Sequence, residues 1–260
     1  MKSLVSSRSF SRRSTMSALA LALVFACGGG ELPRPKPVTQ KLDEVYIARV
    51  PPDQRPEVTN TQNEFQLARS NKMTAEDDYK RAETDVQLAQ GEVEKAGIEE
   101  RSANLKKKDA DASHDMTLAN AAAAEVRAAQ LGHRAADAHV TYAKARRDYL
   151  KMVLRFHEFE VINKEARFEL EKAKIAKSNN IRPDTGFDYA QFESQQKDRS
   201  ESAQRAKNDA EKLRSKMVDK EKAWKDAQKD ADSAHGVTSP PPASGELKGA
   251  DGSPADPNAK

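Results

Sequence analysis

The sequence is poor in the residues from which a layered globular core is built. Aromatic residues make up only 5% of its 260 positions and hydrophobic residues 37%, whereas 33% are charged. Proline, which interrupts helices, is absent from Glu57 through Arg182, although the chain contains 12 prolines. These shortages argue against an ordinary α/β domain and favour an elongated all-α protein.

Clustered positive charge is also lacking in the body of the chain. The formal net charge is +3, but Lys2, Arg8, Arg12 and Arg13 all stand within the first 27 residues, where there is no acidic residue. Removing these four from the 44 basic residues leaves 40 against 41 acidic ones. Neutralising nucleic-acid phosphates requires a basic patch, so we expect no nucleic-acid partner.

Cysteine occurs once, at Cys27, and a disulfide within the chain is therefore excluded. The residues before it, Met16 to Ala26, form an apolar run of 11 residues, MSALALALVFA. This run is too short for a bilayer-spanning helix, which needs about 20 residues, but it has the length of the apolar part of a secretory signal peptide. We expect a signal peptide over residues 1–26.

The end of the apolar run, Val24-Phe25-Ala26-Cys27, resembles the lipobox of bacterial envelope lipoproteins. It has an aliphatic residue three positions before the cysteine and a small residue directly before it, although Phe25 departs from the small or β-branched residue that is usual there. The resemblance covers about 27 residues and implies that Cys27 carries a diacylglycerol thioether and an acylated, palmitate-type amine. Several acyl chains on one residue give durable membrane anchoring. By the same resemblance, Gly28 in place of aspartate favours the periplasmic face of the bacterial outer membrane.

Residues 27–56 have the composition of a tether. Three glycines at 28–30 are followed by Pro33, Pro35 and Pro37, and three more prolines stand at positions 51, 52 and 56. Glycine gives a flexible start and proline a stiffer, extended spacer. Between the prolines, residues 42–50 (LDEVYIARV) have a mixed periodicity that fits a short helix or a strand.

A row of alanines with a strict spacing of seven follows the tether. Its six members are Ala68, Ala75, Ala82, Ala89, Ala96 and Ala103, and three residues before them stand Phe65, Lys72, Tyr79, Val86, Val93 and Glu100. A repeat of this kind sustained over six heptads predicts helices wound around each other in a coiled coil. Alanine lets the helices approach closely, so the partner helix must supply the bulky side chains.

A second heptad pattern runs from Ala121 to Ala173, out of register with the first. The polar segment 109–117 separates the two, and Ser113 or Asp115 can cap a new helix. We predict a long helical hairpin over residues 57–178 that reverses within 109–117 and brings Ala75 opposite Tyr149. One continuous helix with a register shift is the alternative, because neither glycine nor proline marks the turn.

The remaining chain predicts a loop at 179–187, a third helix at 188–235 and a disordered tail at 236–260, where proline and glycine accumulate. The third helix is shorter than the second. It should therefore run back beside it and stop near Gly132, so that an alanine-rich hairpin tip, about residues 97–131, projects. The predicted fold is all-α: an elongated antiparallel coiled-coil helical hairpin with a third, shorter helix packed alongside.

No catalytic, cofactor-binding or metal site is predicted. The five histidines are scattered, with no pair at i, i+4, and there is no second cysteine and no glycine-rich phosphate loop. Four aromatic residues follow the heptad spacing and are assigned to core packing: Tyr142, Tyr149, Phe156 and Phe159. We expect a protein that is not an enzyme and has no cofactor.

Two functional hypotheses remain. The first is a membrane-anchored coiled-coil lipoprotein that acts as a structural spacer, scaffold or adaptor in the cell envelope, bound to the membrane through the lipid on Cys27 and to protein partners through its coiled-coil faces. The second is a periplasmic holdase-like chaperone, or a secretion or efflux accessory protein, that uses the hairpin tip. The C-terminal Lys260 resembles, in that residue alone, an envelope lipoprotein family that is joined to peptidoglycan through its terminal lysine, which implies a peptidoglycan contact.

Overall fold

The computed structural model describes residues 34–181 and 188–236, all of them in one compact unit that begins at Arg34. The predicted signal peptide, Cys27, residues 182–187 of the predicted loop and the predicted tail from residue 237 lie outside the described residues. Within the described ranges the chain forms helices and no strand: α1 (Glu44–Ala48), a 3₁₀ turn (Pro52–Gln54), α2 (Pro56–Ala112), α3 (Met116–Ser178) and α4 (Tyr189–Ala234). The all-α prediction is confirmed for this part of the chain.

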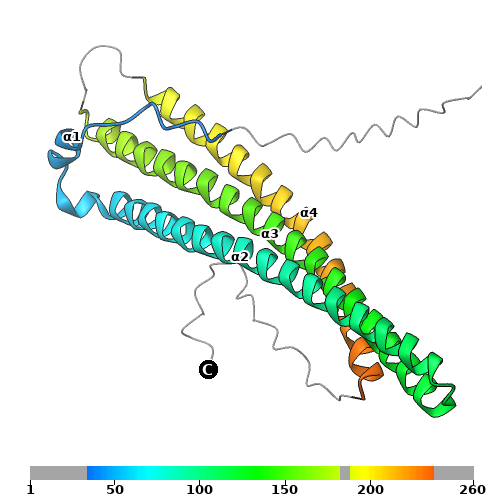
Figure 1. Ribbon diagram of the computed structural model, residues 1–260. Coiled ribbons are helices and arrows are strands. Elements are labelled where there is room, and N and C mark those ends of the chain that lie inside the picture. Colours follow the sequence, from blue (N-terminus) through cyan, green and yellow to red (C-terminus); the bar gives the residue numbers. More distant parts are fainter. Residues whose placement is uncertain (1–33, 182–187, 237–260) are drawn as a thin grey trace, which may run out of the picture. The chain divides into compact units, whose positions relative to one another are not determined.

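Of the three long helices, α3 is the central one, because it contacts both α2 and α4 (Figure 1). α2 and α3 run in opposite directions, because residues further along α2 pair with residues earlier in α3. Glu64 lies 2.9 Å from Lys164, Glu100 lies 2.7 Å from His133, and Lys106 lies 2.9 Å from Glu125.

The alanine row of α2 faces the other helices. Five of its six members are buried: Ala68, Ala75, Ala82, Ala89 and Ala103. Ala75 and Ala82 belong to one core cluster with Tyr149, Leu150 and Val153 of α3 and with Ala210 and Met217 of α4. Small side chains on α2 thus meet large ones on α3 and the large Met217 of α4, which fill the space between closely spaced helices at the density of a protein interior.

The chain reverses between α2 and α3 without glycine or proline. His114 adopts the left-handed conformation, with φ of 57°, which ends α2. The carboxylate of Asp115 then accepts hydrogen bonds from the backbone N–H groups of Thr117 at 2.8 Å and Leu118 at 3.3 Å. These bonds satisfy donors that the first turn of α3 leaves without a helical partner.

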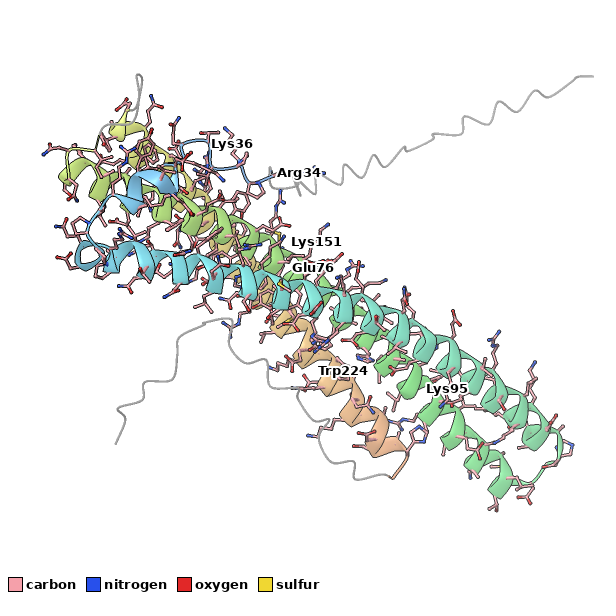
Figure 2. All side chains as sticks on the ribbon, turned by 90° about the vertical axis from the view of Figure 1, so that its left-hand side faces the viewer. Arg34, Lys36, Glu76, Lys95, Lys151 and Trp224 are labelled. Carbon is pink, nitrogen blue, oxygen red and sulfur yellow. The ribbon has the colours of Figure 1, made fainter. Side chains whose placement is uncertain are left out.

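α4 runs along α3 and ends before the α2–α3 turn (Figure 1). Near the end of α4, the indole of Trp224 (labelled in Figure 2) stacks on His139 and Tyr142 of α3, with ring centroids 4.4 and 5.2 Å from that of the indole. Burial raises the pKa of Tyr142 above its ordinary value. Because α4 ends at Ala234, before the α2–α3 turn, the part of the hairpin nearest the turn consists of α2 and α3 alone (Figure 1).

The prediction of a solvated tether over residues 27–56 is wrong from Arg34 onward, whereas the short helix that was one of the two expectations for residues 42–50 is present as α1. Val38, Leu42, Ile47 and Val50 are buried, and the segment includes α1 and the 3₁₀ turn. The prolines and polar residues that suggested a tether belong to a segment that is held against the helices. Burial of four apolar side chains offsets the entropy lost in ordering it.

Replacing the fully buried Ala82 with leucine should destabilise the protein, because three extra carbon atoms must fit where α2 and α3 are in close contact. We expect Ala82→Leu to lower the free energy of unfolding by about 1–3 kcal/mol, as overpacking does. Urea unfolding followed by circular dichroism measures the change. The exposed Ala223 in α4 provides the control, and Ala223→Leu should change stability by no more than about 0.5 kcal/mol. Equal effects of the two substitutions would contradict close α2–α3 packing.

Candidate functional site: the docked N-terminal segment

The segment that precedes the helical hairpin, residues 34–55, is fastened to the helices by both apolar and polar contacts. We call it the N-terminal segment. Its buried side chains include Leu42 and Ile47, which form a small cluster with Ala176 of α3, flanked by Tyr46 and Ile181. Val50 is only 1% exposed, at the bend that leads into α2. This burial fixes the segment at the end of the hairpin where α2 begins and α3 ends.

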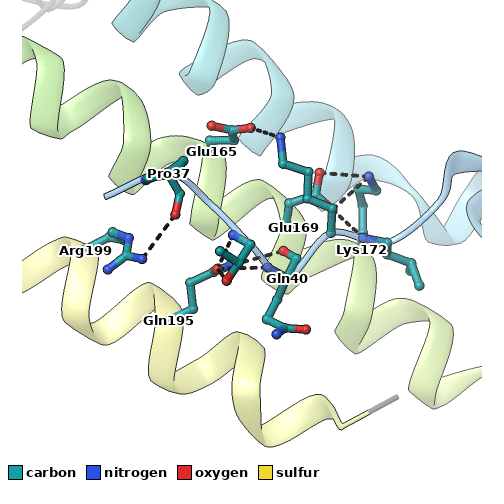
Figure 3. A network of polar contacts seen from close by, with 10 residues as sticks. Pro37, Gln40, Glu165, Glu169, Lys172, Gln195 and Arg199 are labelled. Carbon is teal, nitrogen blue, oxygen red and sulfur yellow. Dashed lines mark hydrogen bonds and ion pairs between the residues drawn. The ribbon is translucent and has the colours of Figure 1, made fainter. Parts of the chain in front are cut away.

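The extended part of the segment is held by one side chain of α4. The side-chain oxygen of Gln195 accepts hydrogen bonds from the backbone N–H groups of Thr39 at 2.8 Å and Gln40 at 3.0 Å, and from the Thr39 hydroxyl at 3.1 Å (Figure 3). Its amide nitrogen donates to the carbonyl of Gln40 at 3.1 Å. Gln195 is itself buried. A single amide therefore serves both the donors and the acceptor of an extended backbone that has no sheet neighbour.

A buried ion pair on α3 holds the next residue of the segment. One Glu169 oxygen accepts a hydrogen bond from the Leu42 N–H at 2.8 Å, and Lys172 lies 2.9 Å from the same carboxylate (Figure 3). Both side chains are almost fully buried, and the Lys172 ammonium also lies 4.9 Å from the centre of the Phe168 ring. A buried carboxylate is costly unless its oxygens are hydrogen-bonded. The docked backbone thus supplies one of the partners that this charge requires.

Two further polar contacts lie nearer the solvent. Arg199 of α4 donates to the carbonyl of Pro37 at 3.2 Å, and Lys41 pairs with Glu165 of α3 at 2.5 Å (Figure 3). The hydrogen bond to Glu165 raises the pKa of Lys41. Because both contacts are solvent-exposed, they contribute less than the buried contacts do and mainly fix the direction of the extended chain.

After α1 the chain turns back into α2. Asp43 caps α1 by accepting the Val45 N–H at 3.0 Å. The Arg55 guanidinium then donates to the carbonyl of Val50 at 2.7 Å through Nε and to that of Ala48 at 2.9 Å through Nη2. These bonds satisfy carbonyls at the end of α1. Pro56 begins α2, where a missing N–H has no cost.

Sequence reasoning did not find this docking, although the sequence contains a signal for it. Six large apolar residues occur within 13 positions: Val38, Leu42, Val45, Tyr46, Ile47 and Val50. That density is too high for a solvated tether, which cannot bury such side chains. The polar contacts left no such signal, because Gln195 lies 155 or 156 positions from the backbone groups that it binds.

The opposite end of the hairpin is the second candidate surface. Its exposed large apolar residues are Ile98, Leu105, Met116 and Leu118. A shallow groove of about 360 Å³ lies between the ends of α2 and α3, with Lys106, Asp109 and Glu125 among its lining residues. The tip therefore combines modest apolar surface with charges of both signs.

The one site residue predicted from the sequence, Cys27, lies outside the described residues. Three of the scattered histidines each contact one glutamate: His133 with Glu100, His139 with Glu92, and His157 with Glu160. Over residues 34–181 and 188–236, no three His, Cys, Asp or Glu side chains come together as a metal-binding set, and no helix has an apolar stretch long enough to cross a membrane.

Comparison with known proteins returned no match to any family model, any curated protein or any solved structure.

Removing the Gln195 side chain should release the N-terminal segment. Gln195→Ala leaves three donors and one acceptor of the segment without their partner, so we expect a loss of about 1–3 kcal/mol in docking free energy. Limited trypsin digestion should then cleave faster after Lys41 and Arg49, and mass spectrometry of the fragments measures the rate. Gln191→Ala, at an exposed position one turn earlier in α4, should leave the rate unchanged. Similar cleavage rates in both variants would contradict the docking role of Gln195.

Proposed function

We propose that the protein is a lipid-anchored helical spacer or scaffold of the bacterial cell envelope, held at the periplasmic face of the outer membrane through Cys27. The finer description of the fold belongs to the same proposal: α2 and α3 form an antiparallel coiled-coil hairpin, with α4 as the shorter third helix. The buried row of alanines at a spacing of seven supports it.

The observation that carries the proposal is the docking of the N-terminal segment. The tether expected from composition has 30 residues, from Cys27 to Pro56, but the first hydrogen bond between this segment and the helices is at Pro37, ten residues after Cys27. Ten residues span at most about 35 Å, against about 100 Å for the whole stretch from Cys27 to Pro56. A short connection holds a helical body close to the membrane, which suits a spacer better than a freely diffusing adaptor.

The direction of the hairpin also supports a spacer. The N-terminal segment binds beside the start of α2 and the end of α3, and the turn at His114 lies at the other end of α2 (Figure 1). α2 has 57 residues and is therefore about 85 Å long. The docked N-terminal segment and the tip are thus at opposite ends of the hairpin, and we propose that partners bind along its faces or at its tip.

The exposed apolar residues of the tip favour a second candidate function. A holdase-like or secretion-accessory protein needs apolar surface that clients can touch, and Met116 and Leu118 provide such surface at the start of α3. The surface is small and interrupted by charged residues. We therefore rank the spacer ahead of the holdase.

The anchoring proposal predicts the behaviour of a Cys27 variant. Cys27→Ser removes the thiol that lipidation modifies, so the protein should remain an unprocessed precursor and lose its partitioning into the detergent phase. Phase separation in a cloud-point detergent, followed by intact-mass measurement, tests both effects. Gly29→Ser, which keeps Cys27, should be processed and partition as the unaltered protein does.

The opposite result is equally clear. If Cys27→Ser is still cleaved before residue 27 and still enters the detergent phase, the anchor is not a lipid on Cys27. The proposed short connection between the membrane and the helices would then be wrong as well.

A further inference from the structure

The distal half of α2 carries a second row of residues that α3 leaves exposed, and Asp109 near its end also lines the groove between α2 and α3. Its large members are Leu88, Ile98 and Leu105, which are 63%, 61% and 62% exposed. Positions 88, 91, 95, 98, 102, 105, 109 and 112 alternate in spacing of three and four, and all eight are exposed. At about 100° per residue this row lies roughly opposite the row of Ala89, Ala96 and Ala103. α2 thus has a heptad row on each of two opposite faces, and only one of them is covered.

The charges in the exposed row are arranged symmetrically about its centre. Lys95 and Asp109 each stand seven residues from Ser102, one before it and one after it. Ile98 and Leu105 flank the same centre at four and three residues. Lys95 is 80% exposed, with only a 3.9 Å contact to Glu99, and no described cation forms an ion pair with Asp109 (Figure 2 labels Lys95). A surface of this kind is complementary to itself after a half-turn.

We propose that this face of α2 binds a second copy of the chain, antiparallel, about a two-fold axis near Ser102. Such an isologous contact places Ile98 of each copy against Leu105 of the other and brings each Lys95 within reach of the other copy's Asp109. A parallel arrangement would place Lys95 on Lys95 and Asp109 on Asp109, and repulsion between like charges opposes it. The small side chains at positions 91, 102 and 112 allow the two helices to approach closely.

The strength of the contact follows from its composition. Each copy contributes only three large apolar side chains, far fewer than an obligate dimer interface buries. The association is therefore weak and depends on concentration. Self-association through this face does not depend on lipidation, so a test of it is independent of the proposed function.

Disulfide trapping tests the contact directly. In the full chain carrying Cys27→Ser, kept in a mild detergent, Ser102→Cys is the only thiol. The two-fold axis places the two cysteines of a dimer together, so oxidation should convert most of the protein into a covalent dimer. Thr74→Cys is the matched control, because it is exposed in the same helix and lies 28 residues from position 102. It should give a several-fold lower yield of dimer.

Charge exchange tests the orientation. Adding Lys95→Asp to the Ser102→Cys chain should lower the dimer yield several-fold, because two acidic residues then face each other across the contact. Adding Asp109→Lys as well should restore the yield, while circular dichroism confirms unchanged helix content. Equal yields from Ser102→Cys and Thr74→Cys, or a yield that does not respond to either charge variant, would overturn the proposal.

Discussion

The helices of this protein are in close contact along rows of alanine, and this contact determines how the other parts of the structure pack. Ala82 and Ala89 of α2 and Ala166 and Ala176 of α3 are fully buried, although alanine contributes little apolar area. Their role is to let the backbones approach, so that the larger residues of α3, such as Tyr149 and Leu150, fill the space between helices. The result is a long helical body built with only 5% aromatic residues.

Such a body has few large side chains with which to hold additional segments, and this explains how the N-terminal segment is bound. Its apolar residues find a small cluster at the end of α3, but its backbone depends on Gln195 and on the Glu169–Lys172 pair. Buried polar groups of this kind have specific partners and tolerate few alternatives. The segment is therefore docked on the helices in one register.

The sequence predicted the helices well and their connections less well, for physical reasons. A repeat of seven over six heptads is a strong signal, and the buried alanines of α2 follow it. The turn had no comparable signal, because His114 reaches the left-handed region without glycine. In α4 the sequence did not single out Gln195, which is buried because its amide binds a segment about 155 positions away. Contacts over such separations leave no periodicity in a single sequence.

Amide hydrogen exchange of the full chain measures directly whether the N-terminal segment is docked on the helices. The N–H groups of Thr39, Gln40 and Leu42 donate to buried side chains, so they should exchange orders of magnitude more slowly than in an unstructured peptide, close to the rates in α4. Peptides covering residues 34–50 report these rates by mass spectrometry. Exchange of these three amides at the rate of an unstructured chain would contradict the account, because the segment would then be a free tether.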